Sequence, residues 1–137
     1  MAFIEKEDFK SAIRGNVLDN VTGFDDARID EAVKFAIDYA KGHLNARYDT
    51  VLIFSQTGSA RSTIVLNYCI DIAIYKLHAL ISPRKMPKHR RENYLDALDW
   101  FDDVKEGKIN QPDLPVPSDG SKAYLVFGGN TKRDNQW

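Results

Sequence analysis

The sequence has little cysteine and almost no net charge, and each scarcity excludes a class of protein. Cys69 is the only cysteine among 137 residues, so the chain cannot form an internal disulfide bond. A formal net charge of −1 gives no overall electrostatic reason to bind nucleic acid or a membrane surface. The opening residues turn acidic at Glu5 before any apolar run develops, so we expect no signal peptide and a protein kept in a reducing compartment.

Groups that could carry out chemistry are equally scarce. His43, His78 and His89 fall in three separate segments, and none is followed by a histidine or cysteine at metal-binding spacing. Cys69 and His78 are nine residues apart on one apolar segment, where a helix would point them away from each other. No glycine-rich phosphate-binding motif is present. The sequence therefore predicts no catalytic residue, no metal site and no cofactor, and a protein that is not an enzyme.

Residues 62–81 form the most apolar run in the chain, and on a helix their side chains would point in nearly every direction. Its apolar residues are Ile64, Val65, Leu66, Ile70, Ile72, Ala73, Ile74, Leu77, Ala79, Leu80 and Ile81. Asp71 and Lys76 interrupt the run, and an ionised group costs about 2.5–3.5 kcal/mol at the centre of a bilayer. We therefore interpret the segment as the central helix of a globular domain and not as a membrane span.

Three further helices are predicted around this central one. The four predicted helices cover residues 3–14, 25–44, 62–81 and 87–105, and the connection 45–61 should be a loop with a short ordered piece. Asp25 and Asp26 suit a helix N-terminus, where unpaired N–H groups favour negative charge. Pro83 and Pro87 bound a tight link, which makes the last two helices an antiparallel pair.

Three aromatic side chains are predicted to lie away from the core. The apolar stripe of the second helix consists of Ile29, Val33, Ala36, Ile37, Ala40 and Leu44. Phe35 and Tyr39 project outside this stripe, where a monomer would have little use for them. In the last helix the apolar face is centred on Tyr94, Leu98 and Phe101. Trp100 lies to one side of that face, so we predict Phe35, Tyr39 and Trp100 as contacts between subunits.

The chain changes character after residue 109. Three prolines within residues 112–117 indicate a linker that cannot be helical. Residues 122–127 then have the composition of a single β-strand, and one strand cannot satisfy its own hydrogen bonds. We therefore predict a helical domain, residues 1–109, and an extended C-terminal arm, residues 110–137, which docks on another molecule.

Asp71 has two interpretations. Beside Tyr75 and His78 it could act as a general base, which would favour a helical enzyme. Alternatively it pairs with an arginine that the helical hairpin brings back toward it; the candidates are Arg84, Arg90 and Arg91. We favour a structural ion pair with Arg90 or Arg91, because an unpaired buried charge is costly.

Charge is divided along the last helix and the link before it. The basic residues Arg84, Lys85, Lys88, Arg90 and Arg91 occur with no acid among them, and six acids against one lysine follow in residues 92–106. Such a basic turn could bind a phosphate backbone, although it has no interleaved aromatic residues and no recognition-helix signature. It could equally be solvated, or meet the acidic face of a neighbouring subunit in a ring.

Several stretches together resemble one family, the small virion proteins of Mu-like phages and prophages, which is similar to the head-completion adaptors of tailed phages. The stretches are Ala2–Phe9, Ala46–Asp49, Ser82–Tyr94 with Ala97 and Trp100, Val104–Ile109 and Phe127–Asn135. The resemblance implies a structural virion protein, made in the cytoplasm of the bacterial host and located at the head–tail junction. None of these stretches is catalytic.

The resemblance also implies partners: further copies in a ring of about twelve subunits, the portal protein, and a tail or head–tail stopper protein. DNA would pass through the ring without sequence-specific binding, and no membrane is involved. The contacts of the arm would be Ala123, Tyr124, Leu125, Val126, Phe127, Asn130, Lys132 and Arg133, together with the basic turn. We predict an all-α fold of four main helices in a compact bundle, with an extended C-terminal arm containing one β-strand. The alternative is a small helical nucleic-acid-binding regulator that uses the basic turn 84–91.

Overall fold

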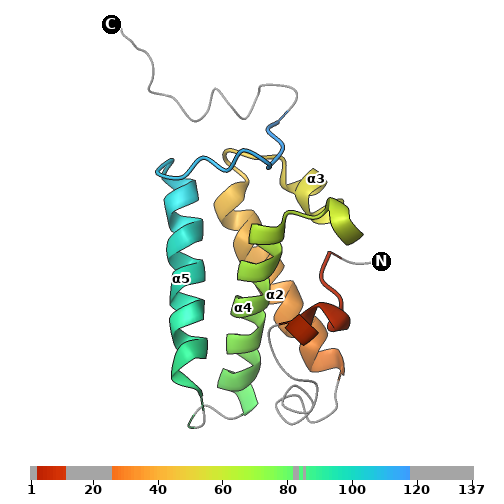
Figure 1. The fold of residues 1–137 in the computed structure, drawn as a ribbon, viewed down its shortest axis with the longest axis vertical. Coiled ribbons are helices and arrows are strands. Elements are labelled where there is room, and N and C mark those ends of the chain that lie inside the picture. Colours follow the sequence, from red (N-terminus) through yellow and green to blue (C-terminus); the bar gives the residue numbers. More distant parts are fainter. Residues whose placement is uncertain (1–2, 12–25, 82–83, 85, 118–137) are drawn as a thin grey trace, which may run out of the picture.

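The structure is a computed structural model that describes residues 3–11, 26–81, 84 and 86–117. Its elements are the 3-10 helix η1 (Lys6–Ser11), α2 (Asp26–Leu44), α3 (Thr50–Ser55), the 3-10 helix η2 (Gly58–Ala60), α4 (Thr63–Ile81) and α5 (Lys88–Lys105) (Figure 1). The prediction of a helical protein is confirmed, and no strand occurs in the described part of the chain. The predicted strand at residues 122–127 lies outside it.

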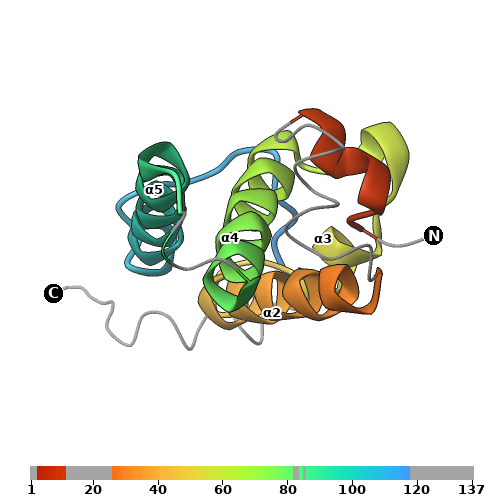
Figure 2. The same ribbon diagram turned by 90° about the horizontal axis from the view of Figure 1, so that it is seen from below.

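Helix α4 lies between α2 and α5 and packs against both, as the two ribbon views show (Figures 1 and 2). The three helices alternate in direction along the chain, so α4 is antiparallel to each neighbour (Figure 1). The predicted antiparallel pair of α4 and α5 is therefore confirmed. The short helix α3 contacts α2 and lies with η2 near the start of α4.

A row of alanines lets α2 approach the central helix. Ala32, Ala36 and Ala40 repeat every four residues on one side of α2, and each is at most 1% exposed. Small side chains at this spacing leave room for the bulkier residues of the facing helix. On α4 the buried side chains are Val65, Cys69, Ile70, Ile72, Ala73, Ile74, Leu77 and His78. The central position predicted for this segment is confirmed.

Within α4, residues Thr63–Leu80 are long and apolar enough to cross a membrane by length and composition alone, with a mean hydropathy of 1.2. In the protein 44% of this window is buried against the other described residues. Packing of α2 and α5 on two sides of α4 accounts for its apolar composition, so we interpret it as the core helix of the bundle.

The apolar face of α5 is centred differently from the prediction. Its buried residues are Ala97, Trp100, Phe101 and Val104, whereas Leu95 is 49% exposed. Trp100 therefore belongs to the core face of α5, because its ring packs against the ring of Tyr68 on α4, with 5.2 Å between the ring centroids. The prediction that Trp100 lies well to one side of the apolar face is wrong.

The predicted helix at residues 3–14 is a 3-10 helix where it is described, over Lys6–Ser11, and Phe9 from it is fully buried. The connection 45–61 contains more order than a loop. Asp49 caps α3 by accepting a hydrogen bond from the N–H of Leu52 (3.1 Å), and η2 follows. The short ordered piece predicted there is confirmed as α3.

Candidate interaction surface

The first part of the predicted arm, residues 110–117, is bound to the helical domain; we call it the arm root. Tyr48, which follows α2, is 2% exposed, and its hydroxyl lies at the centre of this contact. The hydroxyl donates a hydrogen bond to Oδ1 of Asn110 (3.2 Å) and accepts one from the N–H of Gln111 (3.0 Å). A buried tyrosine thus satisfies its polar atom by fixing the chain as it leaves α5.

A backbone contact holds the next residues of the arm root. The N–H of Asp49 donates to the carbonyl oxygen of Pro115 (2.9 Å), and the side chain of Leu114 is buried. The described chain then ends at Pro117 near α3 (Figure 1). The non-helical character predicted for this proline-rich stretch is confirmed, and the structure adds that the stretch packs on its own helices.

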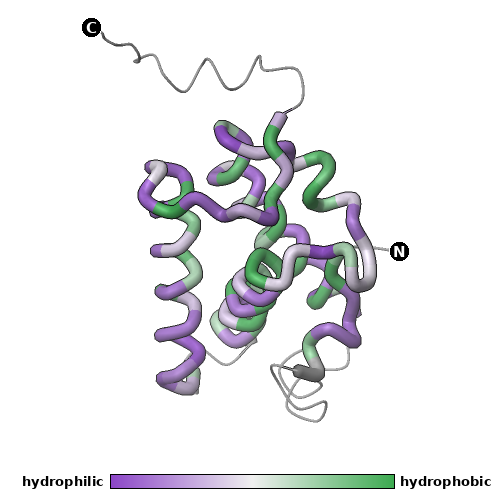
Figure 3. Tube along the Cα trace, turned by 45° about the horizontal axis from the view of Figure 1, so that its top comes forward, coloured by the Kyte–Doolittle hydropathy of each residue, from purple (hydrophilic) through white to green (hydrophobic). Residues whose placement is uncertain are grey.

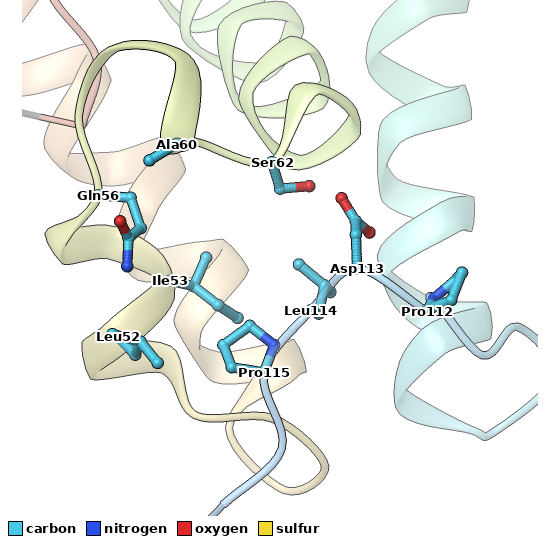
Figure 4. A pocket seen from close by; sticks show the side chains of 9 residues that line it. All are labelled: Leu52, Ile53, Gln56, Ala60, Ser62, Pro112, Asp113, Leu114 and Pro115. Carbon is cyan, nitrogen blue, oxygen red and sulfur yellow. The ribbon is translucent and has the colours of Figure 1, made fainter.

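A hollow of about 420 Å³ lies between the arm root, α3 and the beginning of α4; we call it the groove (Figure 4). It is lined by Leu52, Ile53, Gln56, Ala60, Ser62, Pro112, Asp113, Leu114 and Pro115. Figure 4 shows Asp113 and Ser62 facing each other at one side, with Ile53, Leu114 and Pro115 at the other. The groove therefore has an apolar part and a polar part. Asp113 also lines a second hollow, of about 460 Å³, beside Tyr68 of α4.

Exposed apolar side chains occur on the two segments that line the groove. Val51 and Leu52 on α3 are 77% and 43% exposed, and Val116 in the arm root is 67% exposed. Figure 3 shows this apolar character of α3 in green, in contrast to the purple of much of α5. Of these three residues, only Leu52 lines the groove itself. Exposed apolar side chains beside a hollow are typical of surfaces that bind another chain segment.

The structure separates the three aromatic residues predicted for subunit contacts. Phe35 is 40% exposed, and Nζ of Lys76 lies 4.4 Å from the centre of its ring. Tyr39 packs inside the protomer, against His43 (4.2 Å between ring centroids) and Phe101 (5.9 Å). Burial is the main cause of its raised pKa, and Asp102 adds to it. The expectation that a monomer has little use for Tyr39 is therefore wrong.

Trp100 is only 7% exposed, so its packing on Tyr68 and Phe101 requires no second subunit. Phe35 remains the one of the three aromatic candidates with an exposed face. A role of the three aromatics in subunit contacts stays a prediction.

The basic turn is exposed where it is described. Arg84, Lys88 and Arg91 are exposed, whereas Arg90 is half-buried and burial lowers its pKa. Lys85 lies outside the described residues. The first turn of α5 contains no acid, so its positive side chains stand at the positive end of the helix dipole. Positive charge at this end of the dipole lowers the stability of the helix, and an anionic partner bound there would offset that loss.

Asp71 and Arg90 influence each other without touching. Burial raises the pKa of Asp71, the positive charge of Arg90 opposes this, and Asp96 adds to it. The ion pairs within 4.0 Å between described residues do not include Asp71 with Arg90 or Arg91. The attraction between Asp71 and Arg90 is consistent with the predicted structural ion pair, and a direct pair with Arg90 or Arg91 stays a prediction.

Asp71, Tyr75 and His78, considered together as a possible general-base site, do not converge into a reactive site. The ring of Tyr75 stacks on that of Tyr94 (3.9 Å between centroids, 9° between planes), so it packs on α5. His78 is 5% exposed, and neither ring nitrogen has a hydrogen-bond partner among the described residues. Burial lowers its pKa, followed by the charges of Arg90 and His89. Burial also raises the pKa of the Cys69 thiol, which keeps it protonated and unreactive.

The role of His43 was not predicted from the sequence. Its Nδ1 lies 3.0 Å from the carbonyl oxygen of Tyr39, and its Nε2 lies 3.0 Å from Oδ1 of Asp102 on α5. Since both partners only accept hydrogen bonds, the ring makes both at once only with a hydrogen on each nitrogen. The spacing of Tyr39 and His43 could have indicated their contact, but nothing local in the sequence points to Asp102.

The predicted arm residues Ala123–Phe127, Asn130, Lys132 and Arg133 lie outside the described residues. Among the residues that the structure describes, no cluster of histidine, cysteine and acidic side chains could hold a metal ion. The described surface therefore offers a groove, a basic turn and an acidic helix face, all of which suit contacts with other macromolecules.

Comparisons with known proteins give one match. A family model described as "Bacteriophage Mu, Gp36" matches residues 3–123, which covers most of the chain. No curated protein and no solved structure matches.

Proposed function

Because this chain belongs to the bacteriophage Mu Gp36 family, a family of phage proteins, we propose that it is a structural virion protein, the head–tail connector (adaptor) between portal and tail. It forms a ring at the head–tail junction, after synthesis in the cytoplasm of the bacterial host. Its partners are further copies of itself, the portal protein, and a tail or stopper protein. DNA passes through the ring without sequence-specific binding.

The observation that carries this proposal is the arm root. Hydrogen bonds from Tyr48 and Asp49 fix residues 110–115 on the helical domain, so the chain leaves the domain from a defined position. Twenty residues follow Pro117, and they include the apolar stretch Ala123–Phe127. A rigid start followed by an apolar, strand-forming segment suits an arm that binds a neighbouring subunit or the portal.

The charge distribution of α5 supports side-by-side packing in a ring. Arg84, Lys88 and Arg91 are exposed at one end of the helix, and Asp96 and Asp99 are exposed further along it. A ring is built from contacts between two different patches of the same protein. The basic end of one subunit can therefore meet the acidic part of the next, which favours a directed contact over a two-fold one.

The proposal is tested by mixing the purified protein with its portal protein and imaging the product by electron microscopy. We expect a ring of this protein stacked on the portal. Val126→Asp should weaken portal or subunit binding by at least about tenfold, since it places a charge in an apolar contact. Thr131→Asp, which adds the same charge to the polar tail, is the matched control.

Two results would contradict the proposal. One is the absence of any ring or portal complex over a range of protein concentrations. The other is an equal, small effect of Val126→Asp and Thr131→Asp on complex formation. Reversal of charge at Arg91 with glutamate should impair ring formation, whereas Lys34→Glu on the exposed face of α2 should not.

The exposed basic turn favours a second candidate, a small nucleic-acid-binding regulator. Arg84, Lys88 and Arg91 could neutralise phosphates, and the acid-free first turn of α5 adds N–H groups to them. This candidate requires affinity for duplex DNA that falls steeply with salt and is lost in an Arg84→Glu/Arg91→Glu variant. If binding is weak and insensitive to these substitutions, this candidate is excluded.

A further inference from the structure

The second hollow, of about 460 Å³, lies between the arm root and the first turns of α4. Its lining contains one charged side chain, that of Asp113, and no base; the lining residues are Thr63, Ile64, Asn67, Tyr68, Gln111 and Asp113. Asp113 is exposed and shares the hollow with the first turn of α4, whose dipole favours a negative charge there. Asp113 therefore gives the wall of the hollow a negative charge.

Two more acids lie beside Tyr68, where α4 meets α5. Burial is the main cause of the raised pKa of Tyr68, and the charges of Asp96 and Asp71 add to it, so both carboxylates lie near its hydroxyl. Burial also raises the pKa of Asp71, Arg90 opposes this only in part, and Asp96 adds to it. The ion pairs between described residues include none of Asp71, Asp96 and Asp113. No direct ion pair within the described part of the chain neutralises the negative charge at the hollow.

The exposed bases of the basic turn carry the opposite charge. Arg84, Lys88 and Arg91 are exposed, and none of them takes part in an ion pair between described residues. Guanidinium and ammonium groups donate hydrogen bonds and accept none, so carboxylates suit them as partners. The ring of Tyr68 beside the carboxylates adds a face on which a guanidinium can stack. The basic turn and the second hollow are therefore complementary in charge and in chemistry.

A single protomer cannot bring these two surfaces together. The end of α4 and the start of α5 lie at the opposite end of the bundle from the arm root (Figure 1). An α-helix rises about 1.5 Å per residue, so the 19 residues of α4 separate the two ends by about 27 Å. No arginine or lysine side chain reaches that far. A contact between the two surfaces therefore requires a second molecule, and each copy then keeps one of the two surfaces available for a further copy.

We propose that the second hollow, with the acids beside it, is the docking site for the basic turn of a second copy of this chain. The same acids would repel a phosphate backbone, so nucleic acid does not fit the hollow. The contact itself stands on the hollow, its acids and the exposed bases. That repeated contacts of this kind close into a ring rests on the proposed function. The acidic side of the contact between subunits then lies at the arm root and along the boundary of α4 and α5.

The test is the mass of the purified full chain, measured by light scattering at concentrations up to about 1 mM, where any contact with a lower Kd is populated. We expect the mass to rise beyond that of a dimer, and to fall when salt screens the charges. Asp96→Lys should weaken association by at least about tenfold, because it turns an attraction into a repulsion. Glu31→Lys makes the same charge change on the exposed face of α2 and is the matched control.

Two further variants test the hollow and the turn separately. Asn67→Arg places a positive side chain in the hollow and should weaken association as Asp96→Lys does. Arg91→Glu should weaken it from the side of the basic turn. An equimolar mixture of Asn67→Arg and Arg91→Glu should recover association, since one variant supplies an intact turn and the other an intact hollow. Such recovery also shows that both variants are folded.

The possible outcomes separate this contact from the proposed function. A monomer at every concentration overturns the contact, as do equal effects of Asp96→Lys and Glu31→Lys. Association that ends at a dimer, or that Asn67→Arg leaves unchanged, also overturns it, since the basic turn then docks elsewhere. Self-association with the expected variant effects but without a portal complex keeps the contact and overturns the proposed function. A portal complex of a protein that never associates with itself does the reverse.

Discussion

The two ends of the helical bundle differ in how their polar groups are bonded, although each has a buried side chain with a nitrogen that lacks a hydrogen-bond partner among the described residues, Arg47 at the arm end and His78 at the link end. At the arm end, where α5 finishes and the arm root crosses toward α3, Tyr48 and Asp49 both engage the arm root in hydrogen bonds. At the link end, where α4 finishes and α5 begins, His78 is buried, and no described residue makes a hydrogen bond with either ring nitrogen. The first turn of α5 also lacks an acid there.

This difference shows which end of the protomer is held by hydrogen bonds between distant segments. Each hydrogen bond at the arm end contributes a modest net stability, but leaving one of these buried groups unsatisfied costs about 1–3 kcal/mol. The arm end is therefore an ordered platform for the arm. At the link end the cost of desolvating His78 is not offset by a partner among the described residues, so this end lowers the stability of the protomer.

The largest expected effect on stability concerns the contact between Tyr48 and the arm root. Tyr48→Ala should destabilise the protein by about 3–5 kcal/mol in urea unfolding, because it removes a buried ring as well as both hydrogen bonds to the arm root. Tyr48→Phe keeps the ring and should cost about 1–3 kcal/mol, since the N–H of Gln111 loses its acceptor. If Tyr48→Phe is neutral, the hydroxyl does not hold the arm root.

A second prediction for the arm end concerns Gly107, the glycine that follows α5, and its contact with Arg47. Gly107 has a φ of +83°, and a Cβ placed on it would lie 2.9 Å from Nη1 of Arg47. Gly107→Ala should cost about 1–3 kcal/mol in the free energy of unfolding, from backbone strain plus displacement of Arg47. Gly58→Ala is the matched control: its φ is +59°, but nothing lies within 4 Å of the added Cβ. Equal costs at the two glycines would show that Arg47 is not held in place.

The smallest expected effect concerns the link end and depends on pH. Burial, with help from Arg90 and His89, lowers the pKa of His78 below its usual value. The unfolded chain therefore takes up this proton at higher pH than the folded protein does. Stability should fall as the pH drops from about 6.5 toward the lowered pKa of the folded state.

His78→Leu should remove this acid-dependent loss and raise the free energy of unfolding by about 1–2 kcal/mol at neutral pH, because two unsatisfied buried nitrogens disappear. Thermal unfolding between pH 5 and 8 gives both quantities. His89→Gln, at an exposed position, removes only the last of the three causes of this lowered pKa, so it should keep most of the acid-dependent loss. An unchanged pH dependence in His78→Leu would assign the effect to another group.

The helices that make up the bundle followed from local patterns. The stripe along residues 25–44 and the apolar run 62–81 predicted α2 and α4 closely, and the glycine at 107 marked the end of α5. Helix α3 was harder to predict because its six residues, TVLIFS, are mostly β-branched or aromatic. It forms because Asp49 caps it and Ile53 is buried beneath it.

The candidate surface was only partly predictable. An apolar, strand-forming arm and an exposed basic turn can be read from composition, but the groove requires α3, η2 and the arm root to meet. The burial of Trp100 and Tyr39 also depended on the helices that face them. A helical pattern gives the direction in which a side chain points, but it does not give how much of the helix circumference the neighbouring helices cover. That coverage follows from how α4 and α5 pack.

By itself the sequence determined that the protein is helical, which segment is central and where the helices end, since periodicity, prolines and glycines act locally. Tertiary structure alone decided that the arm root lies on Tyr48 and Asp49, that His43 connects α2 to Asp102, and that the ring nitrogens of His78 lack a hydrogen bond within the described part of the chain. Each of these depends on residues far apart in the chain, and contacts over such separations leave no periodic signal in the sequence.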